Sequence, residues 1–141
     1  MAEDLAWDAF SALTYSLVGV ALMVLGFVLV DVITPGDLRR QIWIDRNRNA
    51  TVLVASNLIG VALINATAIW TSHGSLGQAL LSSAIYGVIG LAAMTLAFLL
   101  IDLFTPGNMR NLVAEPELHP AAYVSAAAHV GIGLVVAAGL S

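Results

Sequence analysis

Residues 15–39 read YSLVGVALMVLGFVLVDVITPGDLR, and residues 86–110 read YGVIGLAAMTLAFLLIDLFTPGNMR. The second stretch follows the first by 71 residues, and 12 of the 25 aligned positions are identical without a gap. An apolar composition produces chance matches of Leu and Ala, but not an aligned Asp, Thr-Pro-Gly and Arg. The chain therefore repeats an apolar segment that ends in the motif Asp-x-x-Thr-Pro-Gly-x-x-Arg.

Four long segments without charged residues make up most of the chain, at 9–30, 50–72, 74–101 and 120–141. Each reaches the roughly 20 residues that a helix needs to cross a hydrocarbon core of about 30 Å. Only 10% of the residues are charged, whereas soluble domains carry about 25%. These features predict an all-α, polytopic membrane protein with four transmembrane helices.

The repeat predicts that these helices form two tandem two-helix units, the first at about 10–72 and the second at about 80–141. Because each unit contains two spans, both units insert in the same orientation and are related by an axis along the membrane normal. The second helices of the two units match more weakly than the first helices. We expect one membrane domain over residues 1–141.

The first apolar segment is expected to remain as a membrane helix. It is preceded by Glu3, Asp4 and Asp8 and by no Lys or Arg. A cleaved signal peptide instead begins with basic residues and has an apolar region of about 7–15 residues. The absence of cysteine excludes disulfides, thiolate catalysis and cysteine-based metal sites.

The basic residues predict how the chain lies in the membrane. All are arginines in the connections after the first and third apolar segments, namely Arg39, Arg40, Arg46 and Arg48, and then Arg110. Short loops rich in basic residues face the cytoplasm. We therefore expect both of these connections to face the cytoplasm and both termini to lie outside it. Trp7 and Trp70 are expected at the outer interface, and Trp43, with residues 41–44, at the inner one.

The doubled motif on two duplicated helix pairs resembles the small bacterial inner-membrane family of unknown function that includes the YjfL protein. The resemblance covers essentially the whole chain. It implies a four-helix inner-membrane protein and carries over no catalytic residues. Proteins similar to this family often lie near genes resembling those of polyamine metabolism, so the resemblance also suggests polyamines as a candidate cargo.

The turns that follow the first and third apolar segments have the same sequence. They consist of Thr34, Pro35 and Gly36 in the first unit and Thr105, Pro106 and Gly107 in the second. Proline disfavours helical geometry in the residue before it, and glycine readily adopts a left-handed helix cap. We expect these turns to stop the helices at the cytoplasmic surface. An alternative is that they are rigid turns that position the Asp and Arg residues of the motif.

Asp31 and Asp102 are expected in the last turn of their helices, where the helix dipole disfavours a carboxylate. They also lie near the lipid boundary, where charge is costly. Three interpretations stay open. The carboxylates are hydrated at the headgroup level, or they form ion pairs with Arg39 and Arg110, or they bind an ion or a cationic substrate.

His129 lies near the middle of the fourth apolar segment and is the only ionisable side chain there. Ionisable residues inside membranes are often functional, but a neutral His hydrogen-bonded to a neighbouring helix is the simpler interpretation. Its candidate partners are Asn57 and Asn65, which could join helices through amide hydrogen bonds or line a narrow polar path. His73, His119 and His129 are expected at different depths, so no metal site is predicted.

Small residues recur at four-residue spacing in these segments, a pattern that allows helices to approach closely within a bundle or between protomers. The pairs are Ser56 and Gly60, Ser83 and Gly87, Ala93 and Ala97, and Ala127 and Gly131. Because Ala and Gly are abundant in this chain, such pairs also arise by chance. They indicate that faces for a homo-oligomer are available.

The sequence contains no phosphate-binding loop, nucleophile elbow or metalloprotease motif, and no basic tract suited to nucleic acid. We therefore expect no enzyme activity, no catalytic residues and no cofactor. The leading hypothesis is a homo-oligomeric component of the bilayer that works with a membrane or cytoplasmic protein partner in the cell envelope. The alternative is a small channel or carrier for a cation or polyamine. It would use Asp31 and Asp102 at its mouth and Asn57, Asn65 and His129 deeper inside.

Overall fold

The computed structural model describes residues 2–34, 36–104 and 115–140, and their secondary structure is helical. The helices are α1 (Ala2–Ile33), α2 (Leu38–Trp43), α3 (Arg48–Trp70), α4 (Leu76–Phe104) and α6 (Pro120–Leu140). Four of them, all except α2, are long and apolar enough to cross a membrane. The prediction of an all-α protein with four membrane helices is therefore confirmed.

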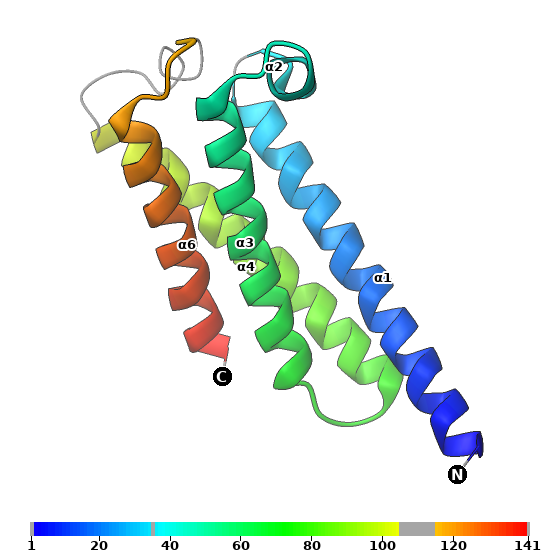
Figure 1. The fold of residues 1–141 in the computed structure, drawn as a ribbon. Coiled ribbons are helices and arrows are strands. Elements are labelled where there is room, and N and C mark those ends of the chain that lie inside the picture. The colour runs from blue at the N-terminus through cyan, green and yellow to red at the C-terminus, as the bar shows by residue number, and fades with distance from the viewer. Residues whose placement is uncertain (1, 35, 105–114, 141) are drawn as a thin grey trace.

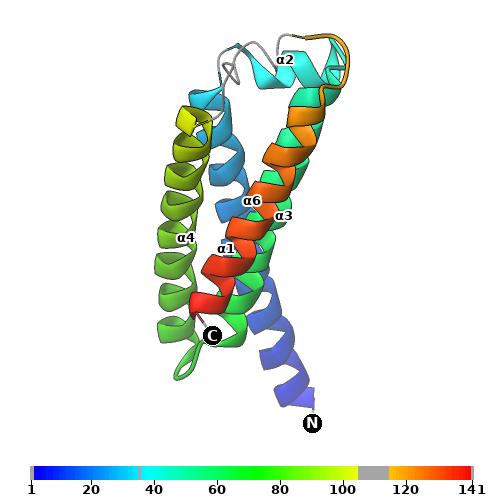
Figure 2. The same cartoon turned by 90° about the vertical axis from the view of Figure 1, so that its left-hand side faces the viewer.

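The four long helices run up and down in one bundle, and α2 lies across the end at which α1 stops (Figures 1 and 2). Both termini lie at the opposite end of the bundle (Figure 1). α3 contacts α1, α4 and α6, and its pairing with α6 is the most extensive in the bundle. It is also the most buried of the four long helices, which explains how this helix can carry several polar side chains.

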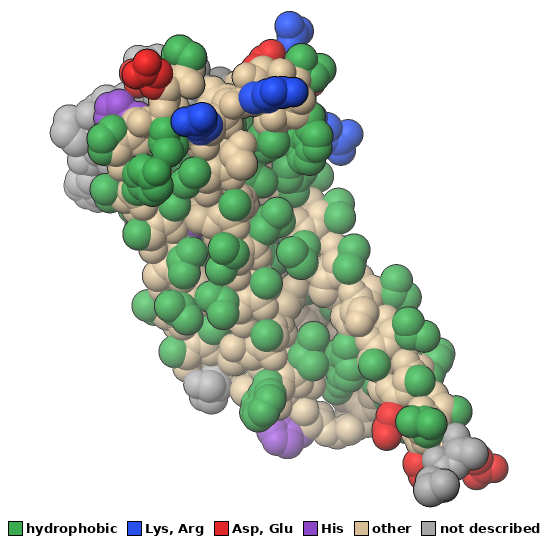
Figure 3. All heavy atoms as spheres, viewed as in Figure 1, with side chains coloured by type: hydrophobic (Ala, Val, Ile, Leu, Met, Phe, Trp, Pro, Cys, Tyr) green, Lys and Arg blue, Asp and Glu red, His purple; other side chains and the backbone are tan. Residues whose placement is uncertain are grey.

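On the face of the bundle shown in Figure 3, hydrophobic side chains are spread along the helices, whereas the arginine side chains visible there lie at the end that carries α2. On α1 the exposed side chains include Leu13, Leu17, Val20 and Val24. Large continuous apolar surface of this kind is rare on soluble monomers and suits contact with lipid tails.

The buried apolar residues form two clusters. Leu38 of α2 belongs to the cluster at the arginine-bearing end, where it is 1% exposed and packs with Ala50, Leu53 and Ala122. The second cluster lies within the bundle and consists of Leu22, Val61, Ile64, Leu91 and Met94. Leu38 thus anchors the short helix α2 on α3 and α6.

Local capping explains where the helices begin. Asp37 is the N-cap of α2, and Asn47 is the N-cap of α3; each side chain accepts a hydrogen bond from a backbone N–H three residues later, at 3.1 Å. Before α4, Ser75 and Gln78 exchange hydrogen bonds between backbone and side chain, which forms a capping box. α1 extends seven residues before the uncharged segment at residue 9, because Glu3 and Asp4 suit a first helical turn.

α3 and α6 approach each other closely where two glycines meet. A Cβ atom placed on Gly133 would lie 2.6 Å from the Cα atom of Gly60, so no larger residue fits there without movement. Gly131 on the same helix points elsewhere, because a Cβ atom there would meet no atom within 4 Å. Gly133 therefore packs inside the bundle, and Gly131 leaves open space on the outer surface of α6.

Candidate functional site

The two asparagines inside the bundle join α3 to α1. The Nδ2 atom of Asn57 donates to the backbone carbonyl of Gly26, and that of Asn65 donates to the carbonyl of Gly19, each at 3.3 Å. Both asparagines are 6% exposed. The side-chain amides thus bond to backbone oxygens of the neighbouring helix, as interhelical hydrogen bonds in membranes commonly do.

His129 joins α6 to α3 in a separate contact. Its Nδ1 atom lies 3.1 Å from the hydroxyl of Ser56, and its ring lies 5.1 Å from that of Phe98 on α4. The Ser56 hydroxyl has one hydrogen, which it donates to the carbonyl of Leu53 at 2.8 Å. The His129 Nδ1–H is then the donor toward Ser56. This arrangement does not place the imidazole as a base for the hydroxyl.

Asn57, Asn65 and His129 therefore do not form one cluster. The asparagines lie between α3 and α1, and His129 lies between α6 and α3. Two grooves hollow the flanks of the bundle, one along α3 and α6 and one along α1 and α4, and neither is lined by these three residues. Each of these three side chains bonds to a neighbouring helix.

Asp31, in the last turn of α1, accepts a hydrogen bond from the backbone N–H of Leu38 at 3.0 Å. This bond ties the end of α1 to the start of α2. Thr34 directly follows α1 and is buried, and Gly36 adopts a φ of 102°, which favours glycine. The carboxylate thus has a backbone partner, and among the residues that the structure describes it forms no ion pair with Arg39.

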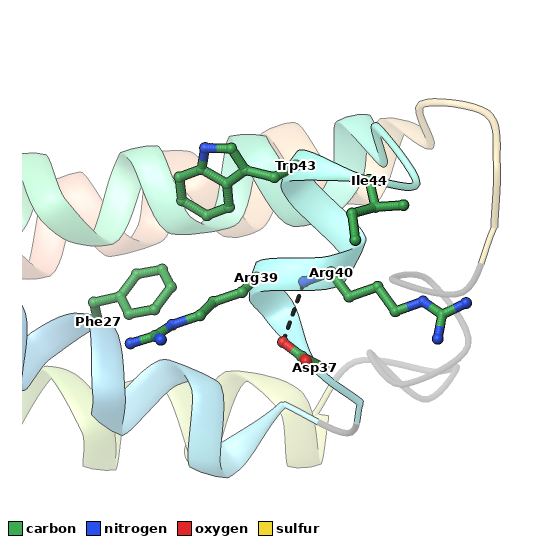
Figure 4. A pocket seen from close by; sticks show the side chains of 6 residues that line it. All are labelled: Phe27, Asp37, Arg39, Arg40, Trp43 and Ile44. Atoms are coloured by element: carbon green, nitrogen blue, oxygen red, sulfur yellow. Dashed lines mark hydrogen bonds between the residues drawn. The ribbon is translucent and has the colours of Figure 1, made fainter.

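Arg39 lies instead in a surface pocket of about 660 Å³ beside α2 (Figure 4). The pocket is lined by Phe27, Asp37, Arg39, Arg40, Trp43 and Ile44. The Arg39 side chain extends toward Phe27, whereas Arg40 points away from it (Figure 4). The Phe27 and Trp43 rings meet edge to face at 6.5 Å. The pocket therefore combines an aromatic wall with a guanidinium group.

The second copy of the motif is only partly described. Asp102 is half-buried and lies in the last turn of α4, which ends at Phe104. Pro35, Thr105, Pro106, Gly107 and Arg110 lie outside the described residues, so the predicted second turn and the pairing of Arg110 stay predictions.

Asn49 is a polar residue whose importance the sequence analysis missed. It is fully buried at the start of α3, and its Nδ2 atom donates to the carbonyls of Glu115 and Glu117 at 3.2 and 2.8 Å. Its Oδ1 atom accepts the backbone N–H of His119 at 2.9 Å. Asn49 thus holds the segment that leads into α6. The available signal in the sequence was the position of Asn49, two residues after Asn47 and directly before the apolar segment that begins at residue 50.

In the parts of the chain that the structure describes, no group of three or more His, Asp or Glu side chains could hold a metal ion. The four apolar helices and the internally bonded polar residues define a multi-pass α-helical membrane protein.

The chain belongs to the family called Domain of Unknown Function DUF350, whose model matches residues 4–140. It is 39% identical over 127 residues to a UPF0719 transmembrane protein of Mycobacterium bovis, covering 90% of this chain and 84% of the relative. It is 38% identical over 133 residues to a UPF0719 transmembrane protein of Mycolicibacterium paratuberculosis, covering 94% and 88%. No solved structure matches the chain. These matches confirm the resemblance to a small bacterial membrane family of unknown function.

Proposed function

We propose that the protein is a non-enzymatic component of the bacterial inner membrane that self-associates and works with a membrane or cytoplasmic protein partner in the cell envelope. The observation that carries this proposal is that the polar side chains inside the bundle form hydrogen bonds between helices. Asn57, Asn65 and His129 each bond to a neighbouring helix. Groups committed to helix contacts suit a rigid membrane scaffold better than a pathway for solutes.

The groove along α3 and α6 offers a face for self-association. It is lined largely by small and aliphatic side chains, including Ala55, Ala127 and Gly131. Ala127 and Gly131 are four residues apart on α6, which is the spacing at which small residues let helices approach closely. Gly133 packs against Gly60 of α3, whereas a Cβ atom placed on Gly131 would meet no atom within 4 Å. Gly131 is therefore available to contact a helix of a second copy.

We propose that the end carrying α2 faces the cytoplasm and that both termini lie outside it. The arginine side chains at that end support this orientation (Figure 3), because short basic loops are retained in the cytoplasm. The proposal of two parallel units is supported by the helix directions. α1 and α4 run one way, and α3 and α6 run the other (Figure 1).

The partner is tested by affinity purification of the tagged full chain from native membranes in a mild detergent. The proposal predicts a second protein that is recovered in constant stoichiometry with the chain. Recovery of the homo-oligomer alone would contradict the part of the proposal that concerns a partner.

The alternative of a cation or polyamine channel or carrier is tested by flux into proteoliposomes. That alternative predicts flux that is abolished when Asp31→Asn and Asp102→Asn are combined in a chain that still folds. The scaffold proposal predicts no flux above that of empty liposomes for either chain. Flux that depends on these carboxylates would overturn it.

A further inference from the structure

The pocket beside α2 has two chemically different sides. Phe27, Trp43 and Ile44 form an apolar side, and Trp43 and Ile44 are 68% and 71% exposed. Arg39 extends along this side toward Phe27 (Figure 4). Trp43 follows Arg39 by four residues on α2, which places both side chains on the same helix face. The pocket thus matches a ligand that has an anionic group joined to an apolar body.

The two acidic side chains that shortly precede Arg39 in the sequence, Asp31 and Asp37, bond to backbone N–H groups. Asp31 accepts the backbone N–H of Leu38 at 3.0 Å, and Asp37 accepts that of Arg40 at 3.1 Å. The ion pair that the structure shows in this region joins Arg40 to Asp45, at 3.9 Å. Within the described residues, Arg39 forms no ion pair. Its guanidinium, with five N–H donors, is available to an external anion.

The depth of the pocket indicates where this anion comes from. Phe27 precedes the end of α1 at Ile33 by six residues, or about 9 Å along a helix axis. Arginines at the ends of membrane helices normally extend toward water, whereas Arg39 extends back toward Phe27 (Figure 4). An anion that meets Arg39 at this level lies between the headgroups and the acyl chains, which is the level of a phospholipid phosphate.

We propose that this pocket binds one anionic phospholipid. The Arg39 guanidinium holds the phosphate through paired N–H donors. Phe27, Trp43 and Ile44 contact the start of the acyl chains, as aromatic residues at membrane interfaces do. Basic pockets on the cytoplasmic side of membrane proteins bind anionic headgroups in this manner. The inference depends on the membrane fold and is independent of the proposed scaffold function.

The test is native mass spectrometry of the full chain purified in detergent and titrated with phosphatidylglycerol or with phosphatidylcholine of the same chain length. We expect the wild type to retain phosphatidylglycerol preferentially. Arg39→Gln should weaken that binding about fivefold, the effect of one basic residue at an anionic surface. Arg48→Gln is the matched control, because Arg48 is an exposed arginine at the start of α3 and does not line the pocket.

Two further arms separate a lipid from a free anion. Trp43→Ala removes part of the apolar side of the pocket and leaves its charge unchanged. It should also weaken phosphatidylglycerol binding, because the acyl chains lose a contact. Excess inorganic phosphate should not displace the lipid. Equal binding of the two lipids, an equal loss in Arg48→Gln, or displacement by inorganic phosphate would each overturn the proposal. If Arg39→Gln does not fold, as judged by helical circular dichroism, unchanged lipid binding by Trp43→Ala would overturn it.

Discussion

Asn65 on α3 reaches across to Gly19 on α1, with its Nδ2 atom 3.3 Å from the Gly19 carbonyl oxygen. The same relationship recurs further along the two helices, where Asn57 donates to Gly26 over the same distance. In a hydrocarbon environment no water replaces a lost partner, so these bonds help to fix how α1 and α3 pair. The asparagines thereby set the rotation of α3 in the bundle.

Asn57→Leu and Asn65→Leu keep the branched shape and the number of non-hydrogen atoms of the side chain but remove the interhelical hydrogen bond. We expect each to lower the free energy of unfolding by about 0.6–2 kcal/mol, measured by titrating the purified chain from mild detergent into SDS. Thr67→Val is the control, because the Thr67 hydroxyl bonds within α3 to the carbonyl of Leu63. Asparagine variants as stable as this control would refute the structural role.

Ser56 and His129 should be energetically coupled. In a double-mutant cycle with Ser56→Ala and His129→Leu, we expect a coupling energy of about 0.6 kcal/mol and at most about 1.7 kcal/mol. The reference cycle combines Ser56→Ala with Asn65→Leu, which lies nine residues from Ser56 on α3, or about 14 Å along the helix axis, and should be additive within about 0.5 kcal/mol. Equal coupling in both cycles would show that the Ser56–His129 hydrogen bond does not contribute.

The neighbouring glycines of α6 should respond to alanine in opposite directions. Gly133→Ala forces apart the close contact with Gly60 and should lower the free energy of unfolding by about 1–3 kcal/mol. Gly131→Ala enters open space and should raise it by roughly 0.5–1 kcal/mol, because alanine favours helix. Both are measured on detergent-solubilised monomer. Equal effects would contradict the described packing of α3 and α6.

Asn49→Ala should loosen the segment before α6. Three hydrogen bonds are lost, each worth about 0.5–1.5 kcal/mol net. Hydrogen–deuterium exchange gives a local readout, because the backbone N–H of His119 is protected while it donates its hydrogen bond to Asn49 Oδ1. We expect faster exchange in residues 115–119. Asp45→Ala, at an exposed position of the α2–α3 loop, should leave this exchange unchanged, and slow exchange in Asn49→Ala would refute the role.

Much of the fold could be predicted from the sequence, because the length of each uncharged segment is fixed by the thickness of the bilayer. The helix directions could be predicted as well, since the segments follow one another across short connections. The start of α1 could not, because Asp8 ends the uncharged segment on its N-terminal side, whereas Glu3 and Asp4 favour a first helical turn. α2 was expected only as residues lying along the inner interface.

The candidate site was less predictable, because nearly uniform apolar segments do not reveal which face of a helix points inward. The sequence left open whether Asn57, Asn65 and His129 line a path or a helix contact, and the structure places them in two separate contacts. It also suggested Arg39 as a partner for Asp31, but in the structure Asp31 accepts the backbone N–H of Leu38 and Arg39 extends toward Phe27 instead (Figure 4). Asn49 was missed because its partners lie far along the chain.

Self-association through the outer face of α3 and α6 is tested most directly by counting protomers in lipid nanodiscs with single-molecule photobleaching. The wild type is expected as an oligomer, and Gly131→Leu as a monomer, because the added side chain fills the groove. Gly77→Leu is the matched control, since a Cβ atom at Gly77 on α4 also meets no atom within 4 Å, and it should remain oligomeric. A monomeric wild type, or a Gly131→Leu variant with an unchanged protomer count, would contradict the proposed scaffold.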